Sequence, residues 1–200
     1  MKRLHILLTI AAAACLAVGC QRGLKFTVTS DIESAKFPPC TAVILSSEQL
    51  AQPVEVEVKD GAFVIQGKVE KPAYATLVPK STDRKGTRAL ILEKGTITFQ
   101  EGKAVGTPLN DAIVDFTRQL KDVFAQHPAG SPELIAAVDQ TYLDFVTLHK
   151  DDPCAVFAIM HANRRISPQT QEKLIATVSP EIRNQGEVRM ASFRLKSQAK

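Results

Sequence analysis

The sequence predicts an α+β protein in which an N-terminal antiparallel β-sandwich or open barrel precedes a C-terminal helical bundle. Residues 24–106 alternate apolar and polar side chains with a period of two, and turn residues separate the runs. Residues 107–200 instead show helical spacing, with capping residues placed before prolines. We therefore divide the chain into a signal segment, 1–19, a β domain, 20–106, and a helical region, 107–200.

The clearest strand pattern in the β domain is "VEVEVKDGAFVIQG". A two-residue turn at 60–61 would pair Val58 with Phe63 and Val56 with Ile65, all on one face. A slip by one residue would invert both faces, so the agreement between turn and alternation favours this register. We expect a hairpin here.

The stretch "RALILEKGTITFQEGKAVG" repeats this pattern further along the chain. A turn at 94–95 would set Leu92 against Ile97, and a second turn would set Phe99 against Ala104. This predicts a three-stranded meander. Together with "LKFTVTSDI", "TAVILSS" and "AYATLVP", the β domain should contain about eight short antiparallel strands.

Helix starts in the second half are marked by a capping residue followed by proline, which is tolerated at the first helical position because its missing N–H has no helical partner. The five capping residues are Thr107, Ser131, Asp152, Ser167 and Ser179. Apolar stripes follow the first two starts, and these consist of Ile113, Phe116, Leu120 and Phe124, and then Leu134, Val138, Tyr142 and Phe145. The third segment, "CAVFAIM", is apolar nearly all round and should be the buried helix. A last helix is expected from Glu187 to Lys196.

The chain opens with a signal-peptide pattern that ends at Cys20. Lys2 and Arg3 precede an apolar stretch shorter than a membrane-spanning helix, and the stretch closes on "LAVGC". This ending resembles the lipobox of bacterial lipoproteins, which implies cleavage before Cys20 and lipidation of its thiol. The absence of an aspartate after Cys20 leads us to expect an outer-membrane-anchored protein that faces the periplasm.

The formal net charge of the chain is +4 at pH 7, and loss of Lys2 and Arg3 with the signal peptide would lower it by two. So balanced a charge gives no reason to expect a nucleic-acid partner. The expected partners are the membrane, through the N-terminal lipid, and a protein of unknown identity.

Three stretches, "VKDGAFVIQGKVEKPAYATL", "LILEKGTITF" and "VGTPLNDAIVDF", resemble the β-rich N-terminal domain that precedes thioredoxin-like domains in TlpA-like thiol:disulfide interchange lipoproteins. The matching residues are Gly61, Phe63, Glu93, Gly95, Gly106, Thr107 and Asn110. The resemblance implies a β-rich fold and a place beside thiol:disulfide proteins. The redox activity of the longer relatives is not implied, because no Cys-x-x-Cys pair occurs in this chain.

Cys15 would leave with the signal peptide and Cys20 would carry lipid, so Cys40 and Cys154 are the remaining thiols. Three interpretations stay open for them: two buried free thiols, a structural disulfide, or an exchange-active pair. The position of Cys154 in the first turn of a helix favours a lowered thiol pKa.

The segment "HKDDPC" is the place to search for metal ligands. It offers His149, Asp151, Asp152 and Cys154, with His161 downstream. Because Asp152 should cap a helix and the spacing matches no closed zinc pattern, we expect no metal and no cofactor. Glu55 and Glu57 share a strand face, but alternation places them toward solvent, and no hydrolase or nucleotide-binding motif occurs.

These observations favour a non-catalytic binding or scaffolding module, which we expect to be accessory to thiol:disulfide or envelope-maintenance proteins. We expect one of two surfaces to bind a partner: a free sheet edge, to which the partner adds a strand, or the cleft where the sheet meets the helices. The alternative is a thiol-disulfide active protein that uses Cys40 and Cys154. A sugar or small-molecule carrier ranks last, because the chain has no Trp and only two Tyr for stacking.

Overall fold

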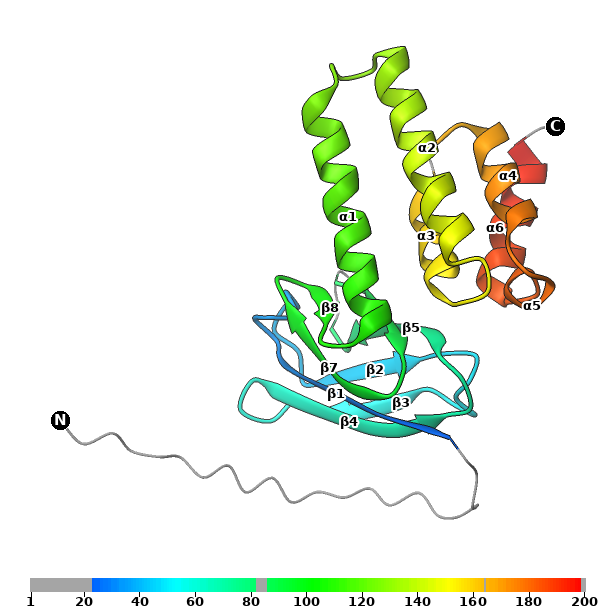
Figure 1. Cartoon of the computed structure of the whole chain (residues 1–200). Coiled ribbons are helices and arrows are strands. Elements are labelled where there is room, and N and C mark those ends of the chain that lie inside the picture. Colours follow the sequence, from blue (N-terminus) through cyan, green and yellow to red (C-terminus); the bar gives the residue numbers. More distant parts are fainter. Residues whose placement is uncertain (1–22, 82–85, 164, 199–200) are drawn as a thin grey trace.

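The computed structural model describes residues 23–81, 86–163 and 165–198, and within them eight strands are followed by six helices (Figure 1). The strands are β1 (Leu24–Asp31), β2 (Ala42–Ser46), β3 (Val54–Glu57), β4 (Ala62–Val69), β5 (Ala73–Pro79), β6 (Arg88–Leu92), β7 (Gly95–Gln100) and β8 (Lys103–Val105). The helices are α1 (Pro108–Gln126), α2 (Pro132–Leu148), α3 (Cys154–Ala162), α4 (Pro168–Thr177), α5 (Pro180–Arg183) and α6 (Gly186–Gln198). The predicted α+β class and the division into strands and then helices are confirmed.

The strands form two four-stranded sheets, in the orders β4-β1-β7-β8 and β3-β2-β5-β6, which pack as a sandwich and do not close into a barrel. Most pairs are antiparallel, as predicted. The exception is β1 with β7, which run parallel, with Val28 beside Ile97. The chain passes from β6 in the second sheet to β7 in the first sheet, and β7 then lies beside β1 in the same direction.

The predicted turn at 60–61 is present, but the predicted hairpin is wrong. Lys59 and Ala62 exchange two backbone hydrogen bonds of 2.9 Å around the turn, and Asp60 and Gly61 have φ of 50° and 77°. Beyond the turn the chain separates: β3 pairs with β2, and β4 pairs with β1. The turn therefore connects the two sheets at one edge of the sandwich.

The predicted meander is correct only in its second turn. Phe99 faces Ala104 across the β7–β8 hairpin, as expected. Leu92, however, pairs with Ala73 in the second sheet, while Ile97 lies in the first. Alternation correctly assigned each side chain to the interior but could not distinguish a neighbour in the same sheet from one in the facing sheet.

Four of the five predicted capping residues directly precede their helix, and the side chains of Ser131, Ser167 and Ser179 each accept a backbone hydrogen bond from the first turn. Thr107 is the N-cap of α1 but accepts no such bond. The helix after Asp152 begins at Cys154, one residue later than predicted, with Pro153 as its N-cap. Asp152 still contributes, because its Oδ1 accepts the Cys154 N–H at 2.9 Å.

Two hydrophobic clusters organise the molecule. One fills the space between the sheets, and the other lies among the helices and extends onto the outer face of the second sheet through Ile91 and Tyr74. Helix α3 is the buried member of the helical cluster, as predicted. The predicted stripe of α1 is buried at Phe116 and Leu120, but Phe124 is 51% exposed because the far ends of α1 and α2 extend beyond the sandwich (Figure 1).

No helix among the described residues is both long and apolar enough to cross a membrane. Cys20, the predicted lipidation residue, lies outside the described residues.

Candidate functional site

The junction between sandwich and helices is fixed by Asn110, which is 1% exposed. Its Oδ1 accepts the Ile91 N–H at 2.9 Å, and its Nδ2 donates to the Ile91 carbonyl at 2.8 Å and to the Thr107 hydroxyl at 2.8 Å. Ile91 lies on β6, the outermost strand of its sheet. The amide of Asn110 therefore takes the place of a further strand at this edge and prevents pairing there.

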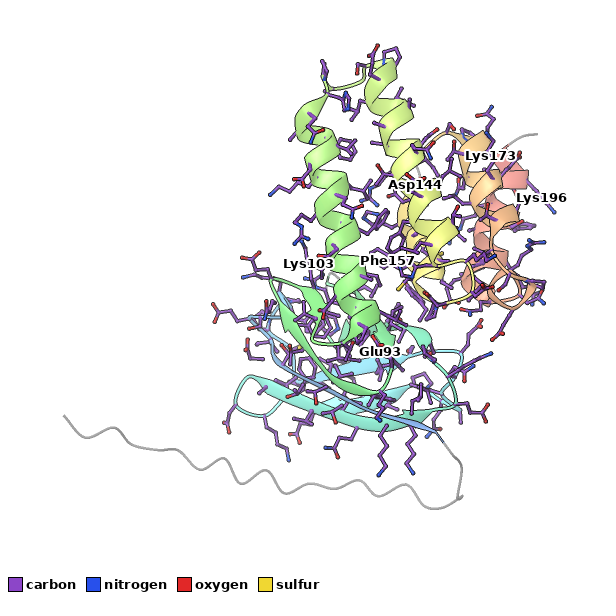
Figure 2. The ribbon with its side chains drawn as sticks, viewed as in Figure 1. Glu93, Lys103, Asp144, Phe157, Lys173 and Lys196 are labelled. Carbon is purple, nitrogen blue, oxygen red and sulfur yellow. The ribbon has the colours of Figure 1, made fainter. Side chains whose placement is uncertain are left out.

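Glu93 completes the same junction from the loop between the two sheets. Its Oε1 accepts backbone N–H groups of Leu109, at 2.8 Å, and Asn110, at 3.3 Å, in the first turn of α1. A carboxylate at a helix N-terminus satisfies donors that lack helical partners and interacts favourably with the helix dipole. Figure 2 shows Glu93 at the foot of α1, where this helix leaves the sandwich. We assign the junction a structural role.

A groove lies beside this junction, between the sandwich and the C-terminal helices. It is formed by the loop after β2, the turn between β4 and β5, and the residues from α5 to the start of α6, and its volume is about 190 Å³. That volume is below the range of about 300–1,000 Å³ typical of drug-sized ligands. It suits one side chain or a small polar group.

Carboxylates dominate the groove. Glu48, Glu181 and Glu187 line it with a single lysine, Lys71, which pairs with Glu181. Burial raises the pKa of Glu187, and the nearby Glu48 raises it further. Burial, with Glu187 as a second cause, raises the pKa of Tyr74 to about 12. In both shifts the second raising cause, after burial, is a neighbouring carboxylate, whose negative charge a bound cation would offset.

Glu48 also holds the two halves of the groove together. Its Oε1 accepts the backbone N–H of Gly186 at 2.6 Å, which places a sandwich carboxylate at the N-terminus of α6. A Cβ on residue 186 would collide with this oxygen, so any larger residue at this position would force the Glu48 carboxylate to move. Within the sandwich side of the groove, the Ser47 hydroxyl donates to the Tyr74 carbonyl at 2.7 Å.

The two thiols predicted to remain are both free, so the disulfide interpretation is not supported. Cys40 is partly exposed and packs against the sandwich cluster, whereas Cys154 is fully buried in the helical cluster and lies 3.4 Å from the Leu109 carbonyl. Burial raises the pKa of both thiols, and the Asp152 and Glu93 carboxylates raise that of Cys154 further. The expectation of a lowered pKa at Cys154 is therefore wrong, because desolvation outweighs the helix dipole.

Three residues of "HKDDPC" do come together. One potential ligand atom from each of His149, Asp152 and Cys154 lies within 4.8 Å of the others. His149 Nδ1 is 2.8 Å from Asp152 Oδ2. Asp151 is exposed and outside this cluster, and His161 Nδ1 instead contacts the Tyr142 hydroxyl at 2.7 Å.

The glutamates of β3 lie on the solvent side, as predicted. Glu55 pairs with Lys80 at 2.7 Å, and Glu57 pairs with Lys59 at 3.6 Å. These are surface ion pairs of small energetic effect. The groove residues, by contrast, were not predicted, because they come from separate segments and belong to no motif.

Comparison with known proteins identifies no relative. No protein-family model, no curated protein and no solved structure matches the chain.

Proposed function

We propose that this protein is a lipid-anchored periplasmic binding or scaffolding module that receives a positively charged group of a partner protein in its acidic groove. The observation that carries the proposal is the groove itself, where three carboxylates converge with one lysine at the contact between sandwich and helices. Charge complementarity of this kind selects cationic partners and accelerates their association.

The groove is a better candidate than the sheet edge at β6. A strand-adding edge needs free backbone groups, and Asn110 already occupies both the N–H and the carbonyl of Ile91. The groove, in contrast, keeps its carboxylates partly accessible, since Glu48 and Glu181 are exposed. A lysine or arginine side chain is of the size and charge that it would accommodate.

A binding experiment tests the groove. The full chain in detergent micelles is titrated with a fluorescent lysine-rich peptide and with a neutral peptide of equal length. We expect salt-sensitive binding of the basic peptide only, weakened up to about fivefold by each of Glu48→Gln and Glu187→Gln. Glu55→Gln, on β3 away from the groove, is the matched control and should bind like wild type. Equal binding of both peptides would refute the proposal that the groove binds cations. Unchanged binding of the basic peptide to a variant that combines Glu48→Gln with Glu187→Gln would refute it as well.

The proposed lipid anchor and outer-membrane location depend on the sequence pattern that ends at Cys20. Metabolic labelling with a clickable fatty acid should mark the wild type and the Cys40→Ser variant but not Cys20→Ser. Labelled protein should fractionate with the outer membrane, because a multiply acylated cysteine holds a chain on a bilayer. Labelling that persists in Cys20→Ser would contradict the lipoprotein proposal.

The alternative thiol-disulfide function has no supporting geometry. The two thiols belong to separate hydrophobic clusters and one of them is fully buried. An exchange reaction requires an accessible thiolate, and burial disfavours it at both positions.

A further inference from the structure

We propose that His149, Asp152 and Cys154 bind one divalent transition-metal ion, with zinc(II) as the natural candidate, at the corner between α2 and α3. An imidazole nitrogen, a carboxylate oxygen and a sulfur are ligands that zinc accepts together. This inference concerns a site separate from the acidic groove and does not depend on the proposed binding function.

The spacing of the three groups is close to that of a metal site. The potential ligand atoms lie within 4.8 Å of one another. Tetrahedral zinc with bonds of about 2.0–2.3 Å brings neighbouring ligand atoms to about 3.5 Å, so modest side-chain movement would complete the site. Three protein ligands leave the fourth position to water.

The surroundings hold these groups in place. The backbone N–H of Cys154 donates to Asp152 Oδ1 at 2.9 Å, which leaves the other oxygen of this carboxylate directed at His149. The ring of His149 packs against Phe145, with ring centroids 4.5 Å apart. Supporting contacts of this kind orient ligands in metal sites.

Access also favours an ion rather than an organic substrate at this corner. Cys154 is 0% exposed, so a substrate could not reach the sulfur. An ion can enter past His149 and Asp152, whose side chains are 13% and 32% exposed. On binding, the thiol proton, which now faces the Leu109 carbonyl, would leave to solvent.

Cobalt(II) is the probe for the experiment, because thiolate coordination gives a sulfur-to-cobalt charge-transfer absorption. The full chain in detergent is titrated with cobalt(II) and then with competing zinc(II). We expect this absorption to saturate at one equivalent, to disappear in Cys154→Ser, and to persist in the matched Cys40→Ser control. His149→Gln and Asp152→Asn should each weaken cobalt binding by more than about tenfold.

If Cys154→Ser fails to fold, variants of the two partly exposed ligands, His149 and Asp152, still test the metal site. Asp152→Asn retains an oxygen that can accept the Cys154 N–H, so circular dichroism should show a wild-type fold in this variant. The proposal is overturned if the absorption is absent in the wild type, or if it survives in Cys154→Ser. Unchanged cobalt affinity in folded Asp152→Asn and His149→Gln would overturn it equally.

Discussion

The side-chain amide of Asn110 pairs with both backbone polar groups of Ile91, as a neighbouring strand would, and so joins the first turn of α1 to the edge of the sandwich. Glu93 adds to this junction, because its carboxylate accepts the backbone N–H groups of Leu109 and Asn110. The contacts of Asn110 and Glu93 give these positions a physical role, which is to set the direction in which the helices leave the sheet.

Replacement of Asn110 should therefore be costly. In Asn110→Ala the buried N–H and carbonyl of Ile91 lose their partners, and we expect the free energy of unfolding to fall by about 3 kcal/mol. Urea denaturation followed by circular dichroism measures the change. Gln126→Ala, at the exposed end of α1, is the control and should stay within about 0.5 kcal/mol of wild type. An equal effect of the two variants would argue against the junction.

Glu93→Gln separates charge from hydrogen bonding at the same junction. Glutamine retains an oxygen for the Leu109 and Asn110 N–H groups but removes the negative charge from the start of α1. We expect a loss of about 1 kcal/mol in urea denaturation, and a larger loss for Glu93→Leu, which removes the acceptor as well. Identical stability of wild type and Glu93→Leu would show that this contact contributes nothing.

His161 should make stability depend on pH. Burial, aided by the charge of Arg165, lowers the pKa of His161 from 6.5 to about 4. Between these values the unfolded chain binds a proton that the folded protein does not, so stability should fall as the pH decreases from about 6.5 to 4. Thermal unfolding across this range should show a flatter slope in His161→Gln than in wild type. His127→Gln keeps His161 and should keep the slope; a slope unchanged in His161→Gln would contradict the assignment.

The thiols should differ in reactivity. Cys40 is partly exposed and Cys154 is fully buried, so a thiol reagent should modify Cys40 in the native protein and Cys154 only after unfolding. Mass spectrometry of the labelled peptides, at increasing urea, measures both rates. Rapid native labelling of Cys154 would revive the thiol-exchange alternative.

The sequence allowed the element types to be predicted more reliably than their partners. Val56 and Ile65 alternate correctly and a turn lies between them, yet Val56 pairs with Val43 and Ile65 with Val28. Facing sheets and neighbouring strands bury the same side chains, so alternation does not decide between them. Serine–proline pairs, in contrast, predicted helix starts well because capping is a local interaction.

The candidate sites show the same division between local and distant contacts. The groove joins Glu48 and Glu187, which are far apart in the sequence and meet only because α6 packs back toward the sandwich. His149, Asp152 and Cys154 are close in sequence but match no ligand-spacing motif, so their convergence became apparent only from the loop between α2 and α3. The burial of Cys154, which reversed its expected pKa direction, likewise depends on the packing of α3.

Site-specific cross-linking in intact cells tests directly whether the groove is where a partner protein binds. A photoreactive amino acid would replace Gln185, which lines the groove, or Gln126, at the far end of α1 as the control. We expect the probe at position 185 to capture one envelope protein and the probe at position 126 to capture none. Glu48→Gln combined with Glu187→Gln should abolish the capture whether or not reductant is present. A product that requires Cys40 or Cys154 and disappears on reduction, or equal capture from both positions, would contradict binding of a partner at the groove.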